Sequence, residues 1–138
     1  MEDWNAVDIL VAEDDDYHAE LTLRALRKVQ VINKVLRVQD GAQALDFVFR
    51  QGQFADRDDA LPKLILLDLH MPKIDGLEVL RQLRESPATQ HIPVGILTSS
   101  SNHTDFFASQ DLLVLDFVLK PVSSEALMDL IKQSGLKS

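Results

Sequence analysis

Several kinds of residue and segment are missing from this chain, and each absence excludes a class of protein. The 138 residues include no cysteine, which excludes a disulfide framework, a thiolate nucleophile and a cysteine-ligated zinc site. No apolar run approaches the ~20 residues of a membrane-spanning helix, and the first residues lack the basic start and long apolar core of a signal peptide. We therefore expect a soluble, cytoplasmic protein without a membrane partner.

Basic residues are also scarce. The chain has 14 Lys and Arg against 22 Asp and Glu, a net charge of −8, whereas nucleic acids and anionic membranes need a basic footprint. The glycine-rich motifs that hold nucleotide phosphates are absent too, so nucleotide binding is unsupported. What remains is an apolar fraction of 46% in a length that suits one domain, and we expect residues 1–138 to form that domain without an appended second one.

Short apolar runs alternate with segments of helical period along the whole chain. The runs are too short for helices, and they predict strands over residues 7–12, 34–39, 64–68, 92–98 and 114–119. Helices are expected between them and after the last one, including a short helix at 104–112. Capping boxes begin two of them, at Asp40 and Asp75. Such alternation predicts an α/β fold with a parallel sheet covered on both faces.

The apolar positions of the predicted helices indicate which residues face the sheet. By contrast, residues 51–62 are polar and long for a connection between a helix and a strand. The residues expected to face inward are Tyr17, Leu21, Ala25, Leu26 and Val29, then Leu45, Val48 and Phe49, then Val79, Leu80 and Leu83, and finally Leu127, Leu130 and Ile131.

Polar residues stand where the predicted strands end. Glu13 and Asp14 follow the first strand, Asp68 ends the third, Thr98 ends the fourth and Lys120 follows the fifth. Each alone has an ordinary structural explanation, such as a helix cap or a solvated lysine. Because parallel strands end at one edge of a sheet, where ligands bind in open α/β folds, the five side chains are expected to converge there.

The chemistry of such a group can be stated from its residue types. Clustered carboxylates repel one another by ~4 kcal/mol for a pair 4 Å apart at an effective dielectric of 20, so they call for a cation. Lys120 offsets one charge, and Mg²⁺ suits an all-oxygen site that also holds a phosphate. A carboxylate can accept a phosphoryl group as an aspartyl phosphate, whose oxygens Lys120 and the Thr98 hydroxyl could stabilise.

Four motifs in this order resemble those of the response-regulator receiver domain of the CheY type over nearly the whole chain. They are ILVAEDD at 9–15, LILLDLHMPKIDG at 64–76, ILTSS at 96–100 and FVLKP at 117–121. The resemblance implies a doubly wound (βα)5 flavodoxin-like domain with strand order 2-1-3-4-5. It also implies a Mg²⁺-dependent phosphorelay protein that a sensor histidine kinase phosphorylates, not an enzyme that turns over an external substrate.

The resemblance also implies roles for individual residues. Lys120-Pro121 is similar to a cis peptide of the family, a bond type that proline tolerates. The roles are Asp68 as phosphoacceptor forming 4-aspartylphosphate, Asp14 as direct Mg²⁺ ligand, Glu13 as a ligand through water, the backbone carbonyl of His70 as a further ligand, Lys120 as the phosphate-pairing lysine, and Thr98 and Phe117 as the switch pair.

The chain departs from the family pattern at some positions. Phe117 has no hydroxyl, whereas many members have tyrosine there. His70 is either an exposed loop histidine or a residue that tunes the lifetime of the phosphoryl group. The segment RQGQFADRDD at 50–59 resembles the single-domain regulators that partner bacterial and cyanobacterial phytochromes, which implies a phytochrome kinase as partner.

Two other functions agree less well with the residues at the strand ends, and one further surface is apolar. A phosphatase of the haloacid-dehalogenase type would need a second Asp two residues after the first, and the chain has Asp68-Leu69-His70. A degenerate receiver would not need the complete set of strand-end residues. Apolar residues at 112–117, with adjacent Phe106 and Phe107, predict a homodimer or docking surface on the fourth helix, fifth strand and fifth helix.

Overall fold

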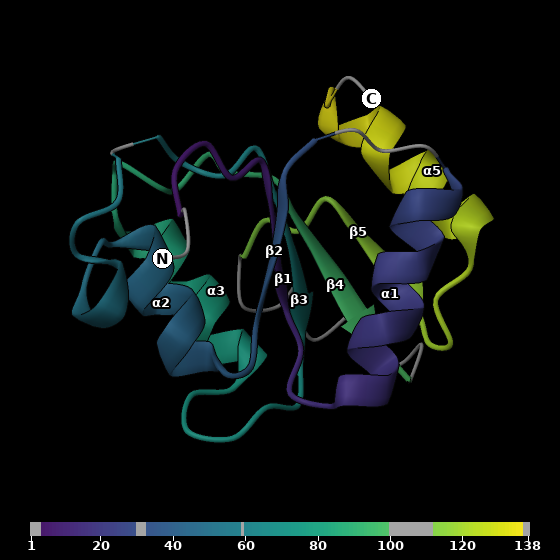
Figure 1. The fold of residues 1–138 in the computed structure, drawn as a ribbon, viewed down its shortest axis with the longest axis horizontal. Helices are drawn as coiled ribbons and strands as arrows, with labels where there is room; N and C mark the ends of the chain where they lie inside the picture. The colour runs from purple at the N-terminus through teal and green to yellow at the C-terminus, as the bar shows by residue number, and fades with distance from the viewer. Residues whose placement is uncertain (1–3, 30–32, 59, 100–111, 137–138) are drawn as a thin grey trace.

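The computed structural model describes residues 4–29, 33–58, 60–99 and 112–136. A parallel sheet of five strands, in the order β2-β1-β3-β4-β5, lies between two layers of helices (Figure 1). This confirms the predicted α/β class and strand order. The strands are β1 (Ile9–Ala12), β2 (Val35–Val38), β3 (Leu64–Asp68), β4 (Val94–Thr98) and β5 (Asp116–Leu119); the helices are α1 (Asp16–Lys28), α2 (Gly41–Val48), α3 (Gly76–Glu85) and α5 (Ser124–Ser134), with a 3₁₀ turn η1 (Gly52–Phe54).

Alternation along the central strands divides the core into two. In β3, Ile65 and Leu67 pack with the residues of α2 and α3, whereas Leu64 and Leu66 pack with those of α1 and α5. Figure 1 shows the same division, with α2 and α3 on one side of the sheet and α1 and α5 on the other. Every residue of β1, β3 and β4 is buried, as expected for strands covered on both faces.

Helix starts follow the predicted capping chemistry. The Asp40 carboxylate accepts from the backbone N–H of Gln43, and the Asp75 carboxylate accepts from that of Glu78. The predicted inward residues of α2, α3 and α5 are buried, apart from half-buried Phe49. Four of the strands begin one or two residues later than predicted because their first residues lie outside the ladder.

The prediction that Tyr17 faces the core is wrong, because this side chain is 70% exposed. Tyr17 lies in the first turn of α1, and the buried residues of this helix are Ala19, Thr22, Ala25 and Leu26. The predicted helix at 104–112 falls almost wholly outside the described residues, as do Phe106 and Phe107. No helix in the described parts of the chain combines the length and the apolarity that crossing a bilayer requires.

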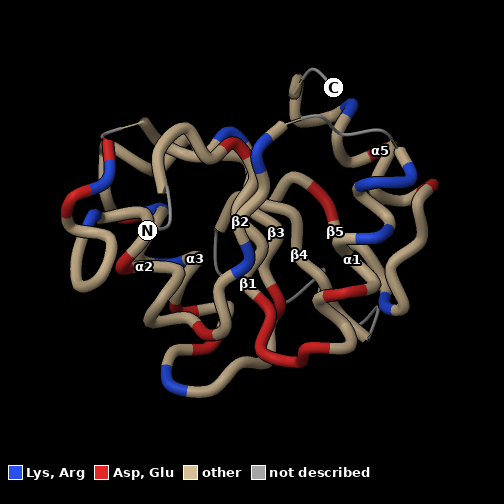
Figure 2. The backbone as a smooth tube through the Cα atoms, in the orientation of Figure 1, with Lys and Arg blue, Asp and Glu red and all other residues tan. Residues whose placement is uncertain are grey.

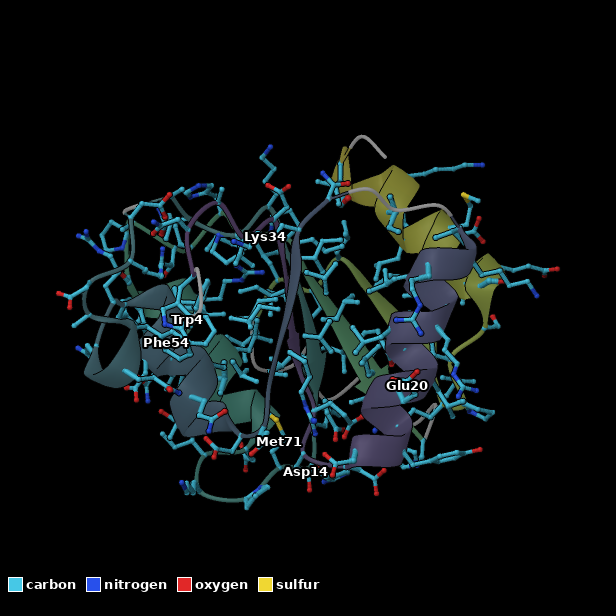
Figure 3. All side chains as sticks on the ribbon, in the orientation of Figure 1. Trp4, Asp14, Glu20, Lys34, Phe54 and Met71 are labelled. Carbon is cyan, nitrogen blue, oxygen red and sulfur yellow. The ribbon has the colours of Figure 1, made fainter. Side chains whose placement is uncertain are left out.

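The connection before β3, residues 51–62, contains a small apolar core that its polar composition does not predict. The Phe54 ring packs edge-on against Trp4 and Phe47, with centroids 4.9 and 5.2 Å apart, and the labelled Trp4 and Phe54 lie together in Figure 3. The Arg57 guanidinium is buried and donates to the carbonyls of Phe47 and Val48 at the end of α2. These contacts join the segment to the rest of the fold.

Candidate phosphorylation and metal site

A cavity of about 650 Å³ lies at the carboxyl ends of the strands. Acidic residues gather at this edge, where β1 leads into α1 (Figure 2), and Asp14 is labelled there in Figure 3. The residues that line the cavity are Glu13, Asp14, Asp15, Tyr17, His18, Leu21, Asp68, His70, Ser99, Lys120 and Pro121. Four of the five predicted strand-end residues are among them, and Thr98 is the exception.

Strand alternation explains which strand-end residues meet. Val11, Leu66 and Val118 face α1 and α5, so residues two positions later face the same way. Those residues are Glu13, Asp68 and Lys120. Thr98 instead follows the alternation of Ile96, on the face of α2 and α3, and is 2% exposed. Its neighbour Ser99 therefore lines the cavity, which the sequence did not indicate.

The Lys120 ammonium lies among the acidic groups. Its Nζ is 2.5 Å from Glu13 Oε1 and 3.3 Å from Asp68 Oδ2, and its side chain is 11% exposed. The other carboxylate oxygen of Asp68, Oδ1, accepts from the backbone N–H of His70 at 3.3 Å. Asp68 is thus held by a cation on one oxygen and by its own loop on the other.

The Glu13 carboxyl is fully buried, and this changes its acidity. Burial, together with hydrogen bonding to Asp68, raises the pKa of Glu13 to about 7, although Lys120 acts in the opposite direction. Because two acidic groups and one ammonium share the site, a proton or a metal ion is needed to balance the remaining charge near neutral pH.

Three carboxylates lie close enough together to hold a metal ion. Glu13, Asp14 and Asp68 each offer an oxygen, and these atoms lie within 4.8 Å of one another. No other such group occurs in the ranges that the structure describes. All donors are oxygens and Asp14 is exposed, so the residues fit a hard divalent cation that keeps part of its water shell.

The backbone around the cluster is fixed by close contacts. Asp15 caps α1 by accepting from the His18 N–H at 2.8 Å. The Arg37 guanidinium, from β2, donates to the Glu13 carbonyl at 2.8 Å and pairs with Asp16. A Cβ at Gly76 would lie 2.4 Å from the Asp68 carbonyl oxygen, so only glycine allows α3 to approach the strand end so closely.

The sequence prediction missed some residues of the site. His18 contributes a ring nitrogen 3.3 Å from Lys120 Nζ, which the position of His18 in the sequence does not indicate. Arg37 lies within the predicted strand 34–39, and the strand pattern gives no sign of its contact with the Glu13 carbonyl. The predicted cis peptide between Lys120 and Pro121 is confirmed. His70 is exposed at the rim of the cavity, which leaves both of its interpretations open.

Comparison with known proteins gives one consistent family. Residues 9–132 match the response regulator receiver domain. The chain is 36% identical over 131 residues to the response regulator Rcp1 of Synechocystis, covering 94% of this chain and 86% of Rcp1. Among solved structures, the bacteriophytochrome response regulator RtBRR is 44% identical with a TM-score of 0.90, covering 95% of this chain and 79% of RtBRR.

Two further solved structures show relatives with a ligand or modification. The Mn²⁺-bound form of Rcp1 is 35% identical with a TM-score of 0.72, covering 91% of this chain and 87% of that one. The phosphorylated cyanobacterial phytochrome response regulator RcpA is 35% identical with a TM-score of 0.74, covering 91% and 88%. With its strand order and its acidic strand-end site, this chain belongs to the response regulator receiver family of two-component signalling proteins.

Proposed function

We propose that Asp68 is the residue that accepts the phosphoryl group from a sensor histidine kinase. The observation that carries this assignment is its position at the end of a buried strand. There, Lys120 Nζ lies 3.3 Å from one carboxylate oxygen, and two further carboxylates lie within 4.8 Å. Among the described residues Glu13 shares this burial and these neighbours, but it stands one residue beyond β1, whereas Asp68 is the last residue of β3.

The reaction is a displacement at phosphorus. An oxygen of the Asp68 carboxylate attacks the phosphorus of the kinase phosphohistidine, and the P–N bond breaks. The electron pair of that bond stays on the imidazole nitrogen, and Asp68 becomes an acyl phosphate. The Lys120 ammonium lies 3.3 Å from Asp68 Oδ2, where it would pair with an oxygen of the transferred phosphoryl group. The chain thus catalyses its own phosphorylation and, with water as attacking group, its own dephosphorylation.

Glu13, Asp14 and Asp68 hold the divalent cation in this proposal, and we assign it as Mg²⁺ because all three donors are oxygens. Asp14 would bind it directly, Glu13 would bind through water, and the backbone carbonyl of His70 would be a further ligand. When bound, the cation supplies positive charge that offsets the carboxylates and the phosphoryl oxygens. The Mn²⁺-bound form of Rcp1 supports a divalent cation in this family.

Thr98 and Phe117 form the proposed switch. The register pairs Phe117 with Ile96 and Thr98 with Leu119, so both side chains belong to the sheet face of α2 and α3. Phe117 is half-buried and packs against the core on that face. We expect ring rotation at Phe117 to accompany movement of the Thr98 hydroxyl toward a phosphorylated Asp68, since Phe117 has no hydroxyl to reposition.

The kinase in this proposal is of the phytochrome type, because RtBRR and RcpA are named as phytochrome response regulators. The output surface in this proposal is a homodimer contact through β5, α5 and the segment 104–112 for which the sequence predicts a helix. Leu113 and Leu119 support it, because their side chains are 72% and 52% exposed near or on the edge strand β5. Light scattering of wild type and a Leu113→Asp, Leu119→Asp double variant, with and without a phosphate mimic, tests the dimer; a monomer in all samples would exclude it.

Phosphotransfer tests the assignment of Asp68. Wild type and Asp68→Asn are incubated with a phosphorylated phytochrome kinase, and separately with phosphoramidate, in the presence of Mg²⁺. We expect label on wild type only, with unchanged circular dichroism in the variant. Full labelling of Asp68→Asn would refute the assignment, and labelling by phosphoramidate but by no phytochrome kinase would refute only the partner.

A further inference from the structure

The position of His18 next to Lys120 is not explained by the functions assigned above. Lys120 Nζ lies 3.3 Å from His18 Nδ1, and both side chains line the cavity at the strand ends. His18 comes from α1, the helix that covers this face of the sheet, and not from a strand end. Its backbone is fixed because its N–H donates to the Asp15 carboxylate that caps the helix.

The hydrogen-bond chemistry of this contact has only one direction. An ammonium has three N–H donors and no lone pair, so in this contact Nδ1 accepts and the ring proton is on Nε2; the Asp15 carboxylate, 3.9 Å from the same nitrogen, is beyond hydrogen-bond distance. Glu13 Oε1 and Asp68 Oδ2 take the other two directions around Nζ. All three donors of Lys120 therefore have an acceptor within hydrogen-bond distance.

A neutral acceptor differs from a carboxylate in what it does to the lysine. A third carboxylate would neutralise more of the positive charge of the ammonium. The proposed reaction needs that positive charge to stabilise the phosphoryl oxygens. An imidazole nitrogen restricts Nζ and leaves its charge in place. A lysine side chain carries about 2 kcal/mol of rotamer entropy, so an additional anchor matters for its alignment.

We propose that His18 is a positioning residue for phosphoryl transfer, which holds the Lys120 ammonium over Asp68 through Nδ1. The inference rests on the proposed roles of Asp68 and Lys120. His18 is not assigned to the metal, because the clustered oxygens belong to Glu13, Asp14 and Asp68, and its Nδ1 faces an ammonium.

Three substitutions separate the acceptor atom from the ring. His18→Asn keeps an acceptor oxygen close to the position of Nδ1, His18→Phe keeps a ring without an acceptor, and His18→Ala removes both. The rate constant for phosphorylation by phosphoramidate is measured at saturating Mg²⁺. We expect His18→Phe and His18→Ala to be about five- to tenfold slower than wild type, as for loss of one charge-assisted hydrogen bond at a half-exposed side chain, and His18→Asn to be within about twofold.

Two further measurements show whether His18 acts through Lys120. In a Lys120→Met background, His18→Phe should cause no further loss, because the group that it positions is gone. The Mg²⁺ concentration for half-maximal rate should be the same in His18→Phe and wild type. His91→Phe, at an exposed histidine outside the cavity, is the matched control and should leave the rate unchanged.

The results distinguish this inference from the proposed function. The positioning role would be overturned if His18→Phe were phosphorylated as fast as wild type. It would also be overturned if His18→Phe lowered the rate by the same factor in wild type and in the Lys120→Met background. In both cases Asp68 would remain the site of labelling. A rate loss that His18→Asn does not restore would also overturn it, because the acceptor atom would then be irrelevant. Labelling of Asp68→Asn in parallel would instead refute the proposed function itself.

Discussion

Removing the charge of Asp14 should change the stability of the protein in opposite directions with and without Mg²⁺. Asp14→Asn keeps the size of the side chain and removes one of three carboxylates whose oxygens lie within 4.8 Å of one another. Without metal, the variant is relieved of like-charge repulsion and should be more stable than wild type. With Mg²⁺, it lacks a ligand and should gain less stability than wild type.

The size of the first effect follows from Coulomb's law. Two charges 4.8 Å apart repel by about 0.9 kcal/mol in water and by about 3.5 kcal/mol at an effective dielectric of 20. Asp14 is exposed and Lys120 offsets part of the negative charge, so the lower figure applies, and we expect a net gain of about 1 kcal/mol. In a domain of this size that raises the melting temperature by roughly 3–5 °C.

The second effect follows from ligand linkage. At a Mg²⁺ concentration of about 100 times the dissociation constant, binding stabilises the native state by about 2.7 kcal/mol, or roughly 8–12 °C in wild type. The variant should gain less than half of that shift. The two melting temperatures should therefore change order as Mg²⁺ is added.

Thermal melts of wild type, Asp14→Asn and Asp16→Asn, with Mg²⁺ or with a chelator, measure both effects. Asp16→Asn removes the same charge two residues away, from a side chain that is 90% exposed and outside the cluster. It should respond to Mg²⁺ as wild type does. An equal Mg²⁺ shift in wild type and Asp14→Asn would refute Asp14 as a ligand.

Two more substitutions test the buried charges. The pKa of Glu13 is raised to about 7 from 4.5, so between these pH values the folded protein keeps a proton that the unfolded chain has released. Metal-free protein should therefore lose stability as the pH rises from 5 to 7. Thermal melts of Glu13→Gln should lack this dependence on pH. Arg57→Met should lower the free energy of unfolding, measured in urea, by about 3–5 kcal/mol, because buried carbonyls such as that of Phe47 lose a charged hydrogen-bond donor. Arg24 is exposed, and Arg24→Met should change the free energy of unfolding by less than about 1 kcal/mol.

The convergence of Glu13, Asp68 and Lys120 could be predicted from the sequence because two regular features locate it. Apolar runs identify the strands, and parallel strands bring their carboxyl ends to one edge. Glu13, Asp68 and Lys120 each stand two residues beyond a residue that faces α1 and α5, so they meet without any special loop. The position of a residue relative to a strand end can be read from a sequence, and the convergence of these three side chains depends on little else.

Residues that reach the site from elsewhere have no comparable pattern. His18 lies on the first turn of α1, and its contact with Lys120 depends on how that turn is placed over the sheet. The guanidinium groups of Arg37 and Arg57 donate to backbone carbonyls, and a carbonyl acceptor is present at every residue. The sequence therefore gives no sign of which arginine is buried in such contacts.

Tyr17 failed as a core prediction for a related reason. Helical spacing from Tyr17 to Leu21 and Ala25 is correct, but the burial of a helix residue also requires a partner surface opposite it. The first turn of α1 lies at the strand ends, beside the cavity that Tyr17 lines. The apolar side chain is exposed because the sheet offers it no facing strand there.

The two faces of the sheet divide the proposed chemistry from the proposed switch. Glu13, Asp68 and Lys120 follow the alternation of the face that α1 and α5 cover, whereas Thr98 and Phe117 follow that of the opposite face. Thr98 adjoins Ser99, which lines the cavity, and β4 pairs with both β3 and β5. A signal from a phosphorylated Asp68 must therefore cross the sheet at the end of β4 before it reaches Phe117. Because a close-packed core transmits small shifts to neighbouring residues, we expect movement at the end of β4 to couple the two faces.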